Sequence, residues 1–170
     1  MFKYFSLFVA LLLFFSGCAT NVPSPGIIIS TENQRGDVIG SYSWKKTLKE
    51  YVDVKGRTAF KKLASDHVDL LFYLDYIAKT SPQLKPQSFP DRKHKLAFYI
   101  NSYNALAMYG VVYHKIPRDF NRFIDRARFF KFTEFNIGGK HISLYDYENK
   151  IIRPMGDPRV HFALNCMVVD

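Results

Sequence analysis

The feature that most constrains the fold is an uncharged segment at residues 96–113, with the sequence LAFYINSYNALAMYGVVY. Its eighteen residues are long enough for a helix that spans a membrane. The segment also carries Asn101, Ser102, Asn104 and four tyrosines, whose polar groups are costly in hydrocarbon. We therefore predict a long central helix that is surrounded by protein on most sides.

Two asparagines give this predicted helix a polar stripe. Asn101 and Asn104 are three residues apart, so they lie on one face of the helix. A buried Asn side chain that finds no hydrogen-bond partner costs about 1–3 kcal/mol. The pair therefore indicates a polar cluster within an apolar body, and two interpretations remain open. The amides either brace the helix against a loop or form the wall of a binding site.

The residues before this segment predict further helices. Residues 43–52 suit a helix with Ser43 as its N-cap, and residues 66–80 suit an amphipathic helix that starts near Asp66. Three prolines make residues 81–90 a loop.

The residues after it predict a small sheet. Residues 131–144 alternate around a Gly-Gly pair at 138–139, which is typical of a β-hairpin. Ser143 suits the N-cap of a short helix, and the apolar residues 160–166 suit a buried strand. The predicted fold class is α+β, with N-terminal helices, a long central buried helix, a β-hairpin and a small C-terminal sheet.

The start of the chain predicts an export signal. It has a charge at Lys3, an apolar core at residues 5–15 and small residues before Cys18. The core is too short for a comfortable membrane span. The sequence FSGC at residues 15–18 resembles a bacterial lipobox, in which the cysteine is lipidated and becomes the first residue of the mature protein.

These features divide the chain into three predicted parts. Residues 1–17 form a lipoprotein signal peptide, residues 18–42 a lipidated Cys18 with a flexible tether, and residues 43–170 one domain. The lipobox resemblance associates an Asp after the cysteine with retention in the inner membrane, and this chain has Ala19 there. We therefore expect a lipid anchor in the outer membrane, on its periplasmic face.

The net charge is +9, and part of the excess lies in residues 118–132, which hold Arg118, Arg122, Arg126, Arg128 and Lys131. Arg122 and Arg126 are four residues apart, so they share a face if the segment is helical. Two interpretations remain open: the segment binds phosphate-rich or anionic surfaces, or it is a solvated face whose phenylalanines point inward. Nucleic acid is not an expected partner for an exported protein.

Three blocks taken together resemble a known family. They are AFYINSYNAL at 97–106, IGGKHISLYDYENKIIR at 137–153 and DPRVHFALNC at 157–166. They resemble the bacterial and plant family called domain of unknown function 547 (DUF547), from about Trp44 to the end of the chain. The resemblance implies no established activity, and bacterial members often look like envelope lipoproteins.

The resemblance also implies a missing part. Family members continue past the HFALNC block through a glycine- or serine-rich step into a Cys-Pro, whereas this sequence ends at Asp170. We therefore expect an incomplete domain whose 160–166 strand lacks partners, and poor solubility of the isolated chain.

Polar residues at family motif positions could form one pocket. His161 could act as a general acid or base, and Glu148 could orient it or tune its pKa. The amides of Asn101 and Asn104 could bind a substrate carbonyl or an oxyanion. Arg159, which directly follows the turn, is a further candidate for substrate binding.

Other interpretations give these residues a structural role instead of a catalytic one. Asp157 and Arg159 could form a local ion pair that only fixes the turn. In a strand, His161 and Cys166 face opposite ways and lie about 16 Å apart, too far for a catalytic pair. Cys166 is then a small core residue or an unpaired reactive thiol.

Metal binding by His161, Glu148 and His141 has no recognised spacing behind it, and we expect neither a metal nor another cofactor.

Two function hypotheses follow from the sequence. The first is a cell-envelope module that binds an unknown envelope ligand or acts as a scaffold. The second is a hydrolase or transferase with His161 as general base.

Overall fold

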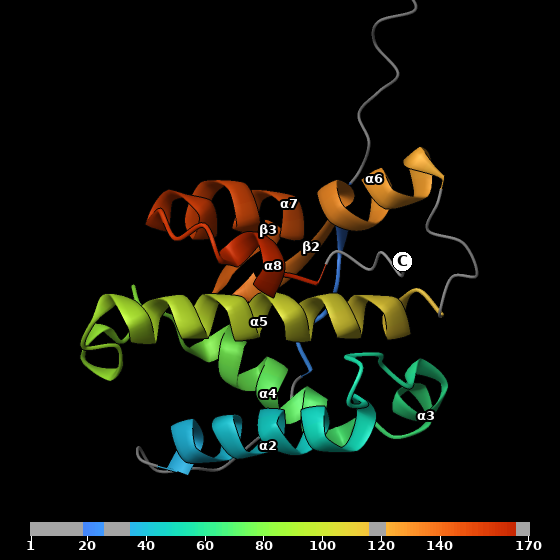
Figure 1. Ribbon diagram of the computed structural model, residues 1–170, viewed down its shortest axis with the longest axis horizontal. Helices are drawn as coiled ribbons and strands as arrows, with labels where there is room; N and C mark the ends of the chain where they lie inside the picture. Colours follow the sequence, from blue (N-terminus) through green and yellow to red (C-terminus); the bar gives the residue numbers. More distant parts are fainter. Residues whose placement is uncertain (1–18, 26–34, 116–121, 166–170) are drawn as a thin grey trace, which may run out of the picture.

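The computed structural model describes residues 19–25, 35–115 and 122–165. Helix α5 (Arg92–Tyr113) runs across the middle of the molecule, with the C-terminal half on one side of it (Figure 1). On the other side lie three helices: α2 (Arg35–Tyr51), α3 (Phe60–Ser65) and α4 (Val68–Lys79). A small three-stranded sheet completes an α+β fold, which confirms the predicted fold class.

The long central helix is confirmed. Helix α5 contains the whole predicted segment 96–113 and begins four residues earlier, where the Asp91 carboxylate accepts a hydrogen bond of 2.9 Å from the His94 N–H. Ser102 is fully buried, donates to the Phe98 carbonyl at 2.7 Å and lies 2.7 Å from the Tyr147 hydroxyl. The Ser102 hydroxyl therefore finds its partners inside the protein. Within the described ranges, no helix has the length and apolar character needed to cross a membrane.

Helix α2 begins at Arg35, eight residues before the predicted start, so Ser43 is not its N-cap. Ser43 is 2% exposed and lies inside the helix, where its carbonyl accepts a hydrogen bond from the Thr47 hydroxyl. The close packing of α2 on α4 explains the difference. A Cβ atom at Gly40 would lie 2.5 Å from Cγ of Tyr76, so the glycine permits this contact one turn before Ser43.

Helix α4 confirms the predicted amphipathic helix, but its N-cap position is His67, without a capping side-chain hydrogen bond, and the predicted cap Asp66 lies one residue earlier. The Asp66 carboxylate accepts a long hydrogen bond of 3.5 Å from Val68 N. Trp44 of α2 stacks on Tyr73 of α4 with ring centroids 5.2 Å apart. The predicted loop at 81–90 contains one short 3₁₀ turn, η2 (Pro86–Ser88).

The predicted hairpin is confirmed as β2 (Thr133–Ile137) and β3 (Lys140–Ser143), joined by Gly138 and Gly139. Both glycines have positive φ, +56° and +77°, as a two-residue hairpin turn of this kind requires. Their N–H groups donate to the last carbonyls of α4, those of Ile77 and Ala78, at 2.9 Å each. The turn therefore satisfies backbone groups at the C-terminal end of that helix.

Part of the predicted flexible tether is ordered. Strand β1 (Thr20–Asn21) pairs in parallel with the start of β2, with Thr20 beside Thr133. Val22, the next residue, is 3% exposed and belongs to the core. The tether prediction over 18–42 thus fails at β1 and at the first turns of α2, because Val22 and Gly40 make buried contacts that the local sequence does not reveal. Cys18 lies outside the described residues.

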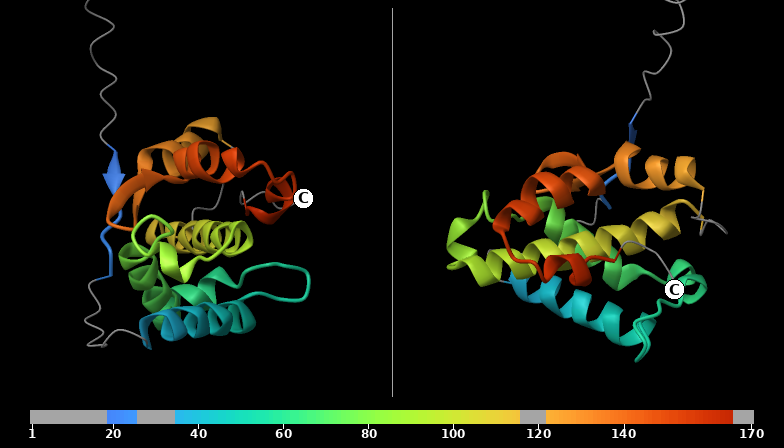
Figure 2. Two further views of the ribbon diagram at one scale, coloured as in Figure 1. Left: turned by 90° about the vertical axis from the view of Figure 1, so that its left-hand side faces the viewer. Right: turned by 45° about the horizontal axis from the view of Figure 1, so that its top comes forward.

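Four further helical elements lie on the same side of α5 as the sheet (Figure 2). They are α6 (Phe123–Phe132), α7 (Leu144–Asp146), the π-helix η3 (Tyr147–Ile152) and the 3₁₀ turn η4 (Arg153–Met155). Ser143 caps α7 as predicted, since its hydroxyl accepts from Asp146 N at 3.1 Å. Gly156, with φ of +69°, ends this helical run.

The predicted strand at 160–166 is wrong. Residues Val160–Ala163 form the short helix α8. A strand would have placed Val160, Phe162 and Leu164 on one face, whereas the protein buries Val160 and Leu164 and leaves Phe162 89% exposed. A spacing of four residues between buried positions is that of one helical turn. The argument that His161 and Cys166 face opposite ways in a strand therefore no longer applies, and Cys166 lies outside the described residues.

Candidate functional site

Asn104 is a structural brace between α5 and α8. Its Nδ2 donates to the Ala163 carbonyl at 2.9 Å, and its Oδ1 accepts from Asn165 N at 2.9 Å. One side chain thus holds the backbone on both sides of Leu164, whose side chain enters the core. Of the two interpretations that the sequence left open, bracing is confirmed for Asn104. Asn101, one turn earlier, is half-buried.

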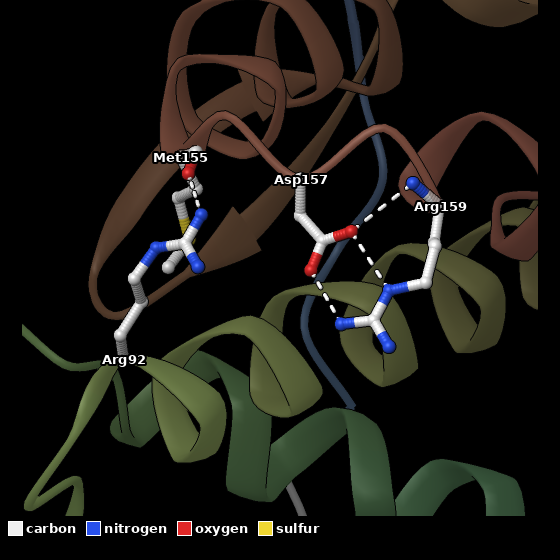
Figure 3. Close-up of polar contacts among 4 residues, drawn as sticks. All are labelled: Arg92, Met155, Asp157 and Arg159. Atoms are coloured by element: carbon white, nitrogen blue, oxygen red, sulfur yellow. Dashed lines mark hydrogen bonds and ion pairs between the residues drawn. The ribbon is translucent and has the colours of Figure 1, made fainter.

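Asp157 and Arg159 form the local ion pair that the sequence suggested (Figure 3). The guanidinium donates to the carboxylate at 2.9 and 2.7 Å, and Arg159 N donates at 3.1 Å. The hydrogen bonds from the Arg159 side chain and backbone, together with the positive charges of Arg159 and Arg92, lower the pKa of Asp157 to about 2. Arg92 itself donates to the Met155 carbonyl and so joins the start of α5 to this turn. One edge of the Arg159 guanidinium is therefore paired with Asp157, while the side chain as a whole is 86% exposed.

The predicted acid–base pair is not brought together in one pocket. Glu148 accepts hydrogen bonds from Arg153 at 2.9 and 2.7 Å and lines a cavity beside α6. His161 is exposed and lines a separate, open hollow with Arg153 and Asp157. Because the two side chains line different hollows, no contact supports Glu148 as the group that orients His161. The other polar pair of the interior, Ser102 and Tyr147, offers no base, since burial raises the pKa of Tyr147 well above its ordinary value.

Beside α6, Glu148 lines an apolar hollow of about 250 Å³, which we call the α6–α7 cavity. It is lined by side chains from four elements: Tyr103 of α5, Phe123, Arg126, Ala127, Phe130 and Lys131 of α6, Tyr145 of α7 and Glu148 of η3. The residues from α6 follow a spacing of three and four, so one face of that helix forms a whole wall. Aromatic walls with a few charged groups are typical of small-molecule sites.

The two basic side chains of this cavity lie over aromatic rings. The Lys131 ammonium is 4.5 Å from the centroid of the Tyr145 ring, and the Arg126 guanidinium is 5.5 Å from that of Phe130. Glu148 is neutralised by its pair with Arg153. The two cations therefore give the cavity a positive rim over an apolar interior.

Sequence reasoning named Glu148 and, within the basic segment, Arg126, but it did not place them in one cavity and did not single out the other lining residues as a site. The signal that could have found them is the stripe at 123, 127, 130 and 131, which is visible once the segment is treated as a helix. The prediction that its phenylalanines point inward is correct for Phe129, at 3% exposed, and wrong for Phe123, at 81%.

The described residues hold no cluster of three or more His, Cys, Asp or Glu side chains that could bind a metal ion. His141 lies on β3, and its predicted partners Glu148 and His161 line different hollows.

Comparison with known proteins gives one match. Searches of curated proteins and of solved structures find none. The family model described as "Protein of unknown function, DUF547" matches residues 86–170, which is half of the chain and includes all three sequence blocks. The match begins at Pro86 rather than near Trp44, so it starts at η2 and leaves α2, α3 and α4 outside. On this match the chain belongs to the DUF547 family.

Proposed function

We propose that this protein is a bacterial cell-envelope lipoprotein whose domain binds a small anionic amphiphile in the α6–α7 cavity. The observation that carries the proposal is the combination of an aromatic cavity of about 250 Å³ with Lys131 and Arg126 at its rim. Ligand pockets usually measure about 300–1,000 Å³, so the ligand is small, such as a single ring system or a short acyl chain. Its apolar part would occupy the cavity and its anionic end would meet the two cations.

Binding is favoured over catalysis by the position of the candidate groups. His161 and Glu148 line different hollows, Arg159 is paired with Asp157, and Asn104 holds the backbone of residues 163–165. A hydrolase with His161 as general base would need a second group within hydrogen-bond reach.

The cavity is tested by titration with anilinonaphthalene sulfonate, an aromatic anion that fluoresces when buried. Ala127→Phe fills the cavity and is expected to weaken binding at least about tenfold. Ala59→Phe adds the same side chain at an exposed position away from the cavity and is the matched control, expected to bind as the unchanged protein does. Equal binding by both variants would show that the probe does not bind in the α6–α7 cavity.

A second measurement tests the preference for anions. Octanoate is expected to displace the probe at lower concentration than octanol, because only the carboxylate meets Lys131 and Arg126. In Lys131→Glu this advantage should disappear while displacement by octanol stays unchanged. Displacement by octanol that equals or exceeds that by octanoate in the unchanged protein would contradict an anionic ligand.

The anchor is tested at Cys18. The lipobox-like sequence before it supports lipidation of its thiol. Cys18→Ser is expected to abolish the incorporation of radiolabelled fatty acid and to release the chain from the membrane fraction. A Cys18→Ser chain that remains labelled and membrane-bound would show that the thiol is not the attachment point.

A further inference from the structure

We propose that the outward face of α6 rests on a bilayer of anionic phospholipid, so that the lipoprotein lies with this helix against the membrane. The inference rests on the proposed lipid anchor and adds an orientation to it. The outward face is formed by Ile124, Arg128 and Phe132, which are spaced by four residues and so form one stripe. None of the three lines the α6–α7 cavity.

The stripe has the chemistry of a membrane-surface helix. Ile124 is 60% exposed and Phe132 45%, and the basic Arg128 lies between them. Among the described residues, neither Arg128 nor Lys131 on the neighbouring row has a carboxylate within ion-pair distance. A helix that exposes apolar side chains beside unpaired cations suits an interface with anionic headgroups.

The N-terminal end of β1, which follows Cys18 closely in the sequence, lies at the same edge of the molecule as the end of α6. Strand β1 runs parallel to β2 with Thr20 beside Thr133, the residue that directly follows the end of α6. The N-terminal end of β1 therefore points to the junction of α6 and β2 (Figures 1 and 2). Thr20 comes two residues after Cys18, and two residue steps span at most about 7 Å. With a strand spacing of about 5 Å, a lipid on Cys18 would attach within about 12 Å of the C-terminal end of α6.

Nearness to the proposed anchor distinguishes the exposed apolar residues of α6 from those elsewhere on the surface. Leu84 is as exposed as Ile124, at 56%, but it lies beside Gly138 at the opposite end of β2 from the anchor. Single exposed apolar side chains are ordinary on protein surfaces. Only on α6 do apolar exposure, unpaired positive charge and nearness to the anchor coincide among the described residues.

Depth-dependent fluorescence quenching tests the orientation. The full chain is produced with its native N-terminus, purified in detergent and reconstituted into vesicles of phosphatidylglycerol and phosphatidylcholine with brominated acyl chains. Two variants are compared, Ile124→Trp on α6 and Leu84→Trp at a site of matched exposure. The native Trp44, which is 6% exposed, is a common background in both.

Bromine is expected to quench Ile124→Trp at least about twofold more than Leu84→Trp, because interfacial helices enter the bilayer by about 5–10 Å. Adding Arg128→Glu or omitting phosphatidylglycerol should remove this difference. Equal quenching at both sites, or none at either with the protein still on the vesicles, overturns the orientation while the anchor stands. Selective quenching of Ile124→Trp in a Cys18→Ser chain would show that α6 binds lipid without the anchor, and a chain recovered free of vesicles would overturn both proposals.

Discussion

Replacing Tyr147 with alanine is expected to lower the free energy of unfolding by about 3–5 kcal/mol. Tyr147 is 1% exposed, and its ring meets that of Tyr99 edge-on at 5.9 Å. Truncation would leave a cavity between α5 and η3, in a part of the core where few side chains are flexible enough to fill it. Urea unfolding followed by circular dichroism measures the effect.

A conservative change separates packing from hydrogen bonding at this position. Tyr147→Phe keeps the ring and removes the hydroxyl that lies 2.7 Å from Ser102 Oγ, so its expected cost is only about 1 kcal/mol. Ser102 retains its bond to the Phe98 carbonyl in that variant. A double-mutant cycle with Ser102→Ala should give a coupling of about 0.5–1.5 kcal/mol. A Tyr147→Ala protein as stable as the unchanged one would show that this region is not packed as described.

Asn104→Ala is expected to lower the free energy of unfolding by about 2 kcal/mol, because it removes the two hydrogen bonds that the side chain makes with the Ala163 carbonyl and the Asn165 N–H. The effect should be local, with faster hydrogen exchange of the Leu164 and Asn165 amides than of the α5 core. Asn101→Ala is the matched control, since Asn101 is the same residue type one turn earlier and half-buried. Its expected effect is within about 0.5 kcal/mol.

The outcome that would contradict the brace is equally specific. If Asn104→Ala and Asn101→Ala exchange their amides at equal rates over residues 160–165, the side chain of Asn104 does not hold this segment. If Asn101→Ala alone were destabilising, the polar stripe of α5 would serve another contact.

Local patterns in the sequence predicted the central helix and the hairpin because both depend on residues close in the chain. An uncharged segment with helical spacing, and a Gly-Gly pair between alternating runs, determine their backbone almost alone. The start of α2 depends instead on a contact between Gly40 and Tyr76. The pairing of β1 depends on a partner strand more than a hundred residues away, with Thr20 beside Thr133. No local pattern carries such information.

The misplaced strand at 160–166 has the same cause. A short apolar run suits a buried strand or a helical turn equally well. The choice is made by Asn104, which binds the backbone on both sides of Leu164, and by Asp157, whose pair with Arg159 fixes the preceding turn. The predicted site differs from the observed one for this reason: a strand would have allowed His161 to face the interior, whereas in helix α8 His161 is exposed. The cavity beside α6 was not predicted because its walls come from four separate elements.

The contact between the hairpin turn and α4 indicates that the helices before Pro86 and the C-terminal half fold as one unit. The two glycine N–H groups at 138–139 terminate a helix that ends before Pro86, where the family likeness starts. An excised fragment from residue 86 onward would lose the carbonyl acceptors of Ile77 and Ala78 and expose the apolar side of α5 that faces α4. The residues that match the family model and the residues that pack together therefore have different boundaries, and shortened versions of this protein should keep the helices that precede Pro86.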